Sequence, residues 1–450
     1  MATNAPAEEY AARRERLQKQ FRAAHGGVRL DKDTSNLFRD RTPAAGARLD
    51  VRDFHHVLSV DPAAGTVDVE GMTPYHVLVD ACLEHGVMPA VVPELRSITI
   101  GGAVSGVGIE SSSFRYGLVH ATMQEAEVLT GDGSIVTARA DNEHADLFLG
   151  LPNSYGTLGY ALRLQVAVVP VRPYVHLHHE RFEDAESFFR ALEAGCEAGE
   201  ADFIDGTAFA PDRMYLTRGR FVDAAPYTSD YGFEHIYYRS IAAREEDYLR
   251  VRDYIWRWDT DWFWCSKNVY AQNPVVRRLL GRKRLNSVTY QKIMRWNARW
   301  GVTTRLNRVR GVHAESVIQD VDIPLERAAE FLEFFDREIG IRPVWICPLR
   351  EPDPNRRFTL YSVEPGRWYV NFGFWDVIRT QDPKPKGHFN RKVERKVAEL
   401  GGVKSLYSSS YYSEDEFWTM LDRPAYAALK ARYDPGGQLK DLYRKAVAGD

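Results

Sequence analysis

The feature that most constrains this chain is a glycine-rich stretch at residues 93–117, PELRSITIGGAVSGVGIESSSFRYG. Four glycines fall within eight residues, at Gly101, Gly102, Gly106 and Gly108, and a run of three serines follows them. A backbone with so few side chains can approach a flat or anionic ligand closely. A mobile surface linker is the alternative interpretation. Apolar residues alternate with the glycines, however, and this pattern predicts burial and close backbone approach.

Two common phosphate-binding motifs do not describe this stretch. The segment 106–111 lacks the third glycine of the dinucleotide fingerprint, and no clean strand-to-helix switch follows it. The GK[ST] signature of a nucleotide-triphosphate loop is also missing from the stretch. The ligand must therefore be recognised by another arrangement.

The stretch instead resembles the second flavin-binding segment of FAD-linked oxidoreductases of the vanillyl-alcohol-oxidase type, which carry a PCMH-type FAD domain. Within that superfamily it is similar to the sterol delta-24 reductase branch. The later strings VIQDVDIP, RPVWICPL and LYSSSYYSEDEFW resemble that branch in the same order. The resemblance covers about residues 28–445. It implies an α+β fold, with a two-subdomain PCMH-type FAD-binding domain followed by an α+β substrate (cap) domain.

These patterns predict three parts of the chain: an N-terminal helix at 1–27, the FAD-binding domain at 28–173 and the cap domain at 174–450. Alternating apolar residues at 56–70 predict two strands, with a helix after them that Thr73 would cap. Gly131-Asp132-Gly133 predicts a hairpin turn. Past Pro173 the composition becomes polar and aromatic.

Composition excludes several classes of protein. The four cysteines lie far apart, without CxxC or metal-ligand spacing, so we expect neither a disulfide framework nor a metal site. The first 25 residues are too charged for a secretory signal, and no apolar run reaches the ~18 residues of a membrane span. The resembling sterol reductases carry an N-terminal membrane anchor, and this sequence departs from them there. We expect a cytoplasmic protein with peripheral contact at the inner face of the membrane.

Charge is distributed unevenly along the chain. Between Arg252 and Arg310, fourteen Lys or Arg accompany three Asp, a net charge of +11 in a chain whose total is −3. Six of the ten tryptophans lie in the same region. It could be a solvated face over a tryptophan-rich core, or a surface that contacts anionic lipid headgroups. Nucleic-acid binding is the third interpretation, but no reader motif is present and we expect no such partner.

The resemblance also implies the cofactor and its contacts. No His falls between Arg29 and Arg41 or between Pro93 and Tyr116, and His120 comes too late, so we expect FAD to be held non-covalently. The implied cofactor-binding residues are Lys32, Thr34, Ser35, Asn36, Leu37, Pro93, Glu94, Thr99, Ile100, Gly101, Gly102, Ala103, Gly106, Gly108, Ile109, Glu110, Ser111, Ser112, Gly156, Thr157, Leu158 and Gly159.

The resembling branch reduces an isolated carbon–carbon double bond in a lipid with NADPH. Such a bond has no carbonyl to accept charge, so a general acid with a raised pKa must act near the hydride donor. Glu110 is the first candidate, with the alternative that it is a structural carboxylate accepting backbone amides of the loop. Tyr411, Tyr407, Glu315 and Asp320, from the cap-side strings, are further candidates.

The expected substrate is a phospholipid-borne or free acyl chain. Bacterial relatives of this branch reduce a methylene-branched fatty acyl chain to the methyl-branched chain, as in tuberculostearic-type lipids, and a lipid methyltransferase would then be a partner. A delta-24 sterol side chain is the alternative. A flavin oxidase or dehydrogenase of an alcohol or sugar, and a non-catalytic flavoprotein partner of another lipid enzyme, remain open.

Overall fold

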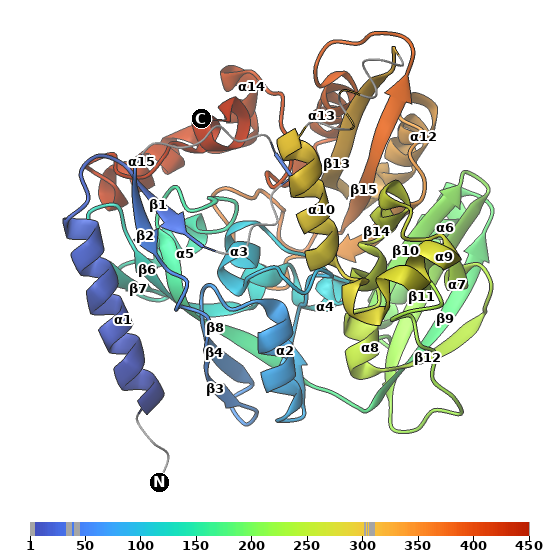
Figure 1. Ribbon diagram of the computed structural model, residues 1–450, viewed down its shortest axis with the longest axis horizontal. Helices are drawn as coiled ribbons and strands as arrows, with labels where there is room; N and C mark the ends of the chain where they lie inside the picture. The colour runs from blue at the N-terminus through green and yellow to red at the C-terminus, as the bar shows by residue number, and fades with distance from the viewer. Residues whose placement is uncertain are drawn as a thin grey trace.

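Two β-sheets with helices packed against them organise the chain (Figure 1). The computed structural model describes residues 5–32, 38–39, 46–300, 303, 305 and 311–449. The chain passes from the first sheet to the second between Pro170 and Tyr174. Helices and mainly antiparallel strands are mixed throughout, which confirms the predicted α+β class.

The first sheet has the order β3-β4-β8-β6-β7, and β5 also pairs with β8. Its central strand β8 alternates buried and half-buried side chains, as a strand between a core and a second layer does. The alternating pattern at 56–70 forms β3 and β4, as predicted. The strands are β3 (Val57–Asp61), β4 (Thr66–Glu70), β5 (Val87–Pro89), β6 (Met123–Leu129), β7 (Ile135–Ala138) and β8 (Tyr160–Pro170).

Short helices connect these strands: α2 (Tyr75–Leu83), α3 (Ile100–Ser105), α4 (Ser113–Tyr116), η1 (Val119–Thr122) and α5 (Ala145–Gly150). Two details differ from the sequence prediction. Helix α2 is preceded by Pro74, because the Thr73 hydroxyl donates to the His56 carbonyl instead of capping the helix. Part of the glycine-rich stretch is the short helix α3, capped by Thr99, which the sequence did not predict.

The N-terminal helix α1 (Ala5–Arg22) packs on the first sheet, beside the parallel pair β1 (Val28–Asp31) and β2 (Ala47–Asp50). Tyr10, Leu17 and Phe21 are buried in a small core shared with these strands. Arg13 forms a buried 2.7 Å ion pair with Glu70 of β4. Because both charges are removed from water, this contact fixes the position of the helix on the sheet.

The second sheet has eight strands in the order β12-β9-β11-β10-β14-β15-β13-β16. In β14, Val344 and Ile346 pack with the helices α6, α12 and α13, whereas Trp345 and Cys347 join the core of the first sheet. This period of two means that one face carries its own helices and the other covers the first domain. The elements are β9 (Tyr174–Phe182), α6 (Ala185–Ala198), β10 (Phe203–Ala210), β11 (Arg213–Val222), β12 (Glu246–Arg250), β13 (His313–Pro324), η5 (Leu325–Arg327), α12 (Ala328–Glu338), β14 (Val344–Leu349), β15 (Tyr369–Thr380), α13 (His388–Glu399) and β16 (Val403–Lys404).

The tryptophan-rich region forms short helices between β11 and β13. Trp256, Trp258, Trp262 and Trp264 are buried, so part of this region is the core that one interpretation of the sequence predicts. Its elements are α7 (Tyr237–Ile241), α8 (Val251–Ile255), η2 (Asp259–Asp261), η3 (Cys265–Val269), α9 (Pro274–Leu280), η4 (Arg282–Arg284) and α10 (Ser287–Trp300). No helix in the described ranges has the length and hydropathy needed to cross a bilayer.

The C-terminal arm returns to the first sheet after α14 (Glu414–Met420), through α15 (Arg423–Tyr433) and η6 (Arg444–Ala448). The Gly131 amide donates to the Tyr433 carbonyl over 2.7 Å. The Lys430 ammonium donates to the Thr157 carbonyl over 2.8 Å. The end of the expected cap segment 174–450 is therefore packed on the FAD-binding half.

Candidate functional site

A cavity of about 570 Å³ lies where the first sheet, the second sheet and the C-terminal arm meet. This volume falls within the roughly 300–1,000 Å³ of small-molecule and cofactor sites. The walls differ in chemistry: the glycine-rich stretch supplies backbone, the ends of the chain supply cations, and the second sheet supplies carboxyl and aromatic side chains. Such a cavity can accommodate a ligand with one anionic part and one flat part.

The glycine wall exists because backbone segments touch one another here. The Gly101 amide donates to the Gly71 carbonyl over 2.9 Å, and a Cβ at position 101 would lie 2.7 Å from that oxygen. A Cβ at Gly106 would lie 2.7 Å from the Gly102 carbonyl. The Gly102 amide donates to the Thr99 hydroxyl at the start of α3. Glycines are therefore needed to pack the wall, and their lack of side chains also leaves it open to a ligand.

Five cationic side chains line another part of the cavity: Arg29, Lys32, Arg39, Lys440 and Lys445. Burial, and then repulsion by Arg39 and Lys32, lowers the pKa of Lys445 well below its usual value. Its ammonium contacts only the Tyr160 ring, at 6.0 Å, among the interactions of the described residues. A buried charge without a counterion is unfavourable, so this end of the cavity favours an anion.

Three polar atoms of cavity-lining side chains have no hydrogen-bond partner in the part of the chain that the structure describes: Arg29 Nε, Glu94 Oε1 and Asn371 Oδ1. FAD presents an anionic diphosphate and a flat ring edged with hydrogen-bonding atoms. The residues present fit FAD. The cations and the glycine wall would hold the diphosphate, and the three unpartnered polar atoms would form hydrogen bonds with polar atoms at the edge of the flat ring. When bound, FAD supplies hydride-transfer chemistry.

A protonatable pair lies on the wall contributed by the second sheet. Tyr407 donates a 2.6 Å hydrogen bond to Asp320 of β13, and both residues line the cavity. Burial raises the pKa of Asp320 to about 7, against the opposing effect of the Tyr407 hydrogen bond. Gly373 lies opposite Asp320 in the sheet, and a Cβ there would approach the carboxylate to 2.7 Å, so the glycine makes room for it.

A second carboxyl group, that of Asp322, lies two residues along the same strand and lines the cavity too. It accepts hydrogen bonds from Tyr361 and, over 2.7 Å, from Asn371. Burial raises its pKa to about 6, and those two bonds oppose the shift. Asp322 is therefore held in place by two donors, whereas Asp320 has the higher pKa and is the better proton donor near neutral pH.

The structure brings twelve of the predicted cofactor-binding residues to the cavity wall: Lys32, Pro93, Glu94, Thr99, Gly101, Gly102, Ala103, Gly106, Gly108, Ile109, Gly156 and Gly159. Six others lie behind the wall: Ile100, Glu110, Ser111, Ser112, Thr157 and Leu158. The predicted residues Thr34, Ser35, Asn36 and Leu37 lie outside the described residues.

Of the predicted catalytic candidates, Tyr407 and Asp320 line the cavity. The Glu110 carboxylate instead forms a buried 2.7 Å ion pair with Arg257 and accepts a hydrogen bond from the Ser111 hydroxyl. This geometry corrects the proton-donor prediction: Glu110 is a structural carboxylate, held by these side chains rather than by the loop amides that the sequence suggested.

Glu315 and Tyr411 also lie away from the cavity wall. The Glu315 carboxylate accepts two hydrogen bonds from Asn390, at the start of α13. The Tyr411 ring packs over Gly387, and its amide donates to Glu394. Both residues therefore position α13, and this geometry gives neither of them access to a ligand in the cavity.

Several wall residues were not predicted from the sequence: Arg29, Arg39, Tyr155, Tyr160, Asp322, Trp375, Lys440 and Lys445. Arg29 and Arg39 flank the predicted cofactor-binding residues 32–37, so these neighbours were the available signal. Lys440 and Lys445 have no motif around them. They reach the cavity only because the C-terminal arm folds back on the first sheet.

Replacing Lys445 with Met is expected to weaken FAD binding roughly 10–100-fold, the value of one or two charge-assisted hydrogen bonds. The apoprotein is expected to be no less stable than the wild type, because the change removes a half-buried ammonium group that neighbouring cations repel. FAD titration by flavin fluorescence, and thermal unfolding of the apoprotein, measure the two effects. Lys19→Met on the exposed side of α1 is the matched control, and equal FAD affinity in both variants would refute the assignment.

Comparison with known proteins agrees with this geometry. Residues 23–139 match the family described as the FAD binding domain. The chain is 26% identical over 401 residues to the Delta(24)-sterol reductase of Homo sapiens, covering 86% of this chain and 75% of that protein. It is 25% identical over 445 residues to the Delta(24)-sterol reductase of Pisum sativum, covering 89% and 76%.

A shorter similarity is to Cytokinin dehydrogenase 7 of Oryza sativa subsp. japonica, 31% identical over 148 residues, which cover 32% of this chain and 28% of that protein. The matched family segment includes the glycine wall and the N-terminal cations of the cavity. The family match and the chemistry of the cavity thus identify the same ligand. The chain therefore carries a PCMH-type FAD-binding domain and is an FAD-dependent oxidoreductase.

Proposed function

We propose that this protein reduces an isolated carbon–carbon double bond in a lipid, with FAD held non-covalently in the cavity and NADPH as the electron donor. Two long similarities to proteins named Delta(24)-sterol reductase support the type of bond. None of the described residues that line the cavity is His, which supports a non-covalent cofactor. His120 is buried outside this wall, where burial lowers its pKa to about 3.

The Asp320–Tyr407 pair is the observation that carries this proposal. Reduction of the alkene needs a hydride on one carbon and a proton on the other, while NADPH is oxidised to NADP⁺. Asp320 is half-buried, is hydrogen-bonded by Tyr407 and has a pKa of about 7, so it can hold a proton at neutral pH and release it to a substrate carbon. The aromatic side chains of Phe38 and Trp375 line the same cavity.

A methylene-branched fatty acyl chain is the substrate that we propose. Protonation of its methylene carbon places positive charge on the branching carbon of the chain, which becomes a tertiary cation. The hydride then adds to that branching carbon. The methylene carbon must be added by an enzyme that transfers one carbon to lipids, so a lipid methyltransferase is the proposed partner. A delta-24 sterol side chain also has an alkene carbon with two further carbon substituents, which protonation of its neighbour would make a tertiary cation, and the similarity to Delta(24)-sterol reductases favours it as the second candidate.

The test is to incubate the FAD-loaded protein with NADPH and a methylene-branched phospholipid, and then to determine the mass of the released fatty acids. A gain of two hydrogens supports the proposal, and turnover of a delta-24 sterol alone would assign the second candidate. Anaerobic mixing with NADPH should bleach the flavin absorbance. A protein that stays yellow, and reduces neither substrate, would be acting in a different reaction.

A further inference from the structure

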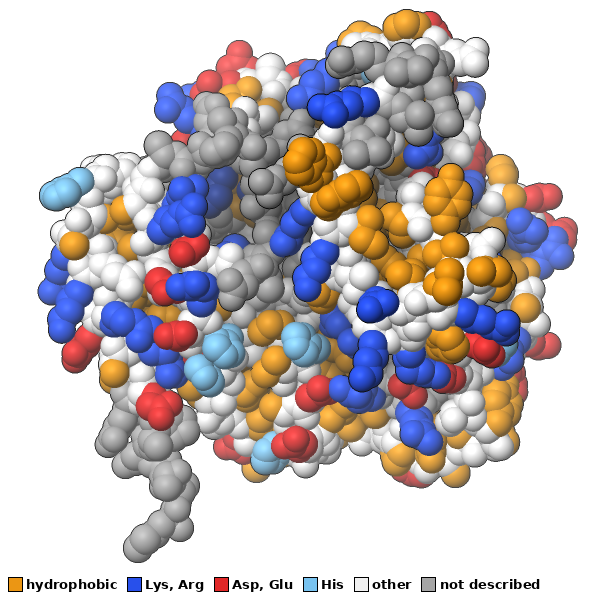
Figure 2. All heavy atoms as spheres, in the orientation of Figure 1, with side chains coloured by type: hydrophobic (Ala, Val, Ile, Leu, Met, Phe, Trp, Pro, Cys, Tyr) orange, Lys and Arg blue, Asp and Glu red, His pale blue; other side chains and the backbone are white. Residues whose placement is uncertain are grey.

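An exposed apolar surface lies on the segment between β12 and β13. We call it the α9–α10 face and define it by its exposed hydrophobic side chains: Tyr270, Val275, Leu279, Ile293, Met294, Trp296 and Trp300. Leu279 is 76% exposed and Trp296 is 57% exposed. Among the described residues, Tyr227 is the one other large hydrophobic side chain in the exposed class. Hydrophobic side chains gather in Figure 2 where Figure 1 places α9 and α10.

The two sides of α10 explain why these side chains face solvent. Ser287 and Tyr290 are buried, and the Tyr290 hydroxyl donates to the Thr260 carbonyl, so the inner side of the helix is attached to the protein. The residues 292–296 are all exposed. The outer side is thus apolar without being needed for the core, and large exposed apolar patches mark interaction surfaces.

The border of this face is basic. The sequence contains twelve Lys or Arg and no Asp or Glu between Trp262 and Ala314. Arg278 and Arg282 form ion pairs with Glu234 and Asp230. Lys283, Arg284 and Lys292 are exposed and make no ion pair with any residue that the structure describes. Figure 2 shows Lys and Arg side chains along the edge of the apolar group.

We propose that the α9–α10 face docks on an anionic lipid bilayer. Tryptophan and aliphatic side chains enter the boundary between headgroups and acyl chains, while lysine and arginine beside them bind the anionic headgroups. The face offers both kinds of contact on one side of two adjacent helices. A nucleic acid would use the cations but not the exposed leucine, valine and isoleucine.

Aromatic contacts connect this face to the cavity. Tyr290 stacks on Trp262 at 6.3 Å between ring centroids, Trp262 lies 5.7 Å from Phe38, and Phe38 lies 4.9 Å from Trp375. Phe38 and Trp375 line the cavity wall near Asp320. Docking would therefore bring the cap side of the cavity close to lipid. The docking itself does not depend on the proposed reaction, and either can be true alone.

Co-sedimentation with vesicles tests the docking. The FAD-loaded protein is mixed with vesicles of phosphatidylcholine alone, or of equal parts phosphatidylcholine and phosphatidylglycerol. The apolar variant is Leu279→Ser with Trp296→Ser, and its control is Tyr227→Ser. The charge variant is Lys283→Glu with Arg284→Glu and Lys292→Glu. Its control, Lys19→Glu with Arg22→Glu and Arg190→Glu, changes the net charge equally at exposed positions elsewhere.

The wild type and both controls are expected to bind the anionic vesicles and to bind phosphatidylcholine far more weakly. Relative to the wild type, the apolar variant should bind anionic vesicles at least about tenfold more weakly. The charge variant should bind them about a hundredfold more weakly. Salt should reduce binding of the wild type. Flavin absorbance and circular dichroism establish that each variant is folded, and Trp296→Ser alone replaces the double variant if that one is not.

Three results would overturn the docking proposal. The first is wild-type protein that does not sediment with anionic vesicles, and the second is charge and control variants that bind them equally. The third is a wild-type dimer, detected by analytical ultracentrifugation, that the apolar variant dissociates and that does not bind vesicles, because the face would then bind a second copy. Reduction of a detergent-dispersed substrate is measured in parallel, so that failure of docking and failure of the reductase proposal are separate results.

Discussion

Asp320→Asn is expected to lower kcat of double-bond reduction by about 10²–10⁴-fold, the usual contribution of a positioned general acid. The amide keeps the size of the side chain but cannot deliver the proton. FAD binding should change little, because Asp320 belongs to the wall contributed by the second sheet, whereas the five cationic side chains come from other segments. Single-turnover reduction of the alkene by pre-reduced protein measures the chemical step directly.

The pH profile separates catalysis from a structural role. Asp320 acts while protonated, so the wild-type rate should be constant below its pKa of about 7 and fall roughly tenfold per pH unit above it. Tyr407→Phe removes the hydrogen bond that lowers the pKa of Asp320, so its descending limb should move to higher pH. A Tyr407→Phe variant whose rate falls as far as that of Asp320→Asn, and whose residual activity keeps an unshifted limb, would instead assign the proton to Tyr407.

Glu94→Gln is the comparison variant, because Glu94 is a buried carboxyl group on the part of the cavity wall that the glycine-rich stretch contributes. Burial, and then the charge of Glu110, raises its pKa well above the usual value. If Glu94→Gln abolishes the chemical step while Asp320→Asn retains it, the proton comes from the flavin side of the cavity and the assignment of Asp320 is wrong.

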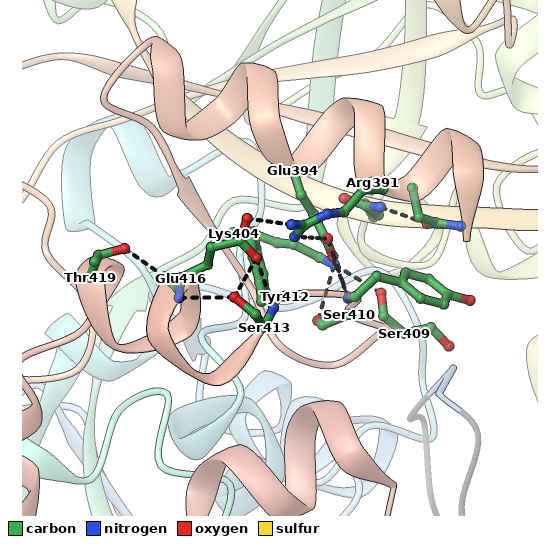
Figure 3. A network of polar contacts seen from close by, with 12 residues as sticks. Arg391, Glu394, Lys404, Ser409, Ser410, Tyr412, Ser413, Glu416 and Thr419 are labelled. Carbon is green, nitrogen blue, oxygen red and sulfur yellow. Dashed lines mark hydrogen bonds and ion pairs between the residues drawn. The ribbon is translucent and has the colours of Figure 1, made fainter. Parts of the chain in front are cut away.

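Lys404→Met is expected to lower the free energy of unfolding by up to about 3–5 kcal/mol, because it removes the nearer of the two cations beside the buried Glu394 carboxylate and leaves only Arg391, at 3.8 Å. Lys404 and Glu394 are both buried and lie 2.8 Å apart. The Lys404 ammonium also donates to the Ser409 carbonyl and the Ser410 hydroxyl, as Figure 3 shows. Urea unfolding of the apoprotein is the measurement, since bound FAD would add its own stabilisation.

The double variant Lys404→Met with Glu394→Leu is the control for this effect. Replacing both charges with apolar groups is often neutral or stabilising, so the double variant should recover most of the lost stability. Equal destabilisation in the single and double variants would mean that the ion pair is not its cause.

The segment that contains Lys404 also contributes to the cavity. Residues 404–413 run from β16 past the cavity, and Ser405 and Tyr407 from this segment line its wall. The Phe38 amide donates to the Tyr407 carbonyl, and Arg39 donates to the Leu406 carbonyl. The segment thus joins the second sheet to the N-terminal part of the cavity, and Lys404→Met is expected to weaken FAD binding as well as stability.

Local patterns in the sequence predicted the elements well and their ends less well. Strand alternation located β3 and β4, since the period of two depends only on neighbouring residues. Helix α2 begins after Pro74 rather than Thr73, because a tertiary hydrogen bond to the His56 carbonyl uses the predicted cap. Helix α3 was not predicted from its glycines, since their contact with Gly71 is not visible in a local pattern.

The sequence by itself determined the α+β class and the glycine wall, because both depend on residues close together in the chain. Only the tertiary structure decided which ionisable groups meet in the cavity. Asp320 and Lys445 reach it from distant segments, whereas Glu110 is held by Arg257 although it directly follows the wall residue Ile109. Whether a carboxyl group faces a cation, a hydroxyl group or an apolar wall depends on segments that pack together after folding, and that environment sets its pKa and its chemical role.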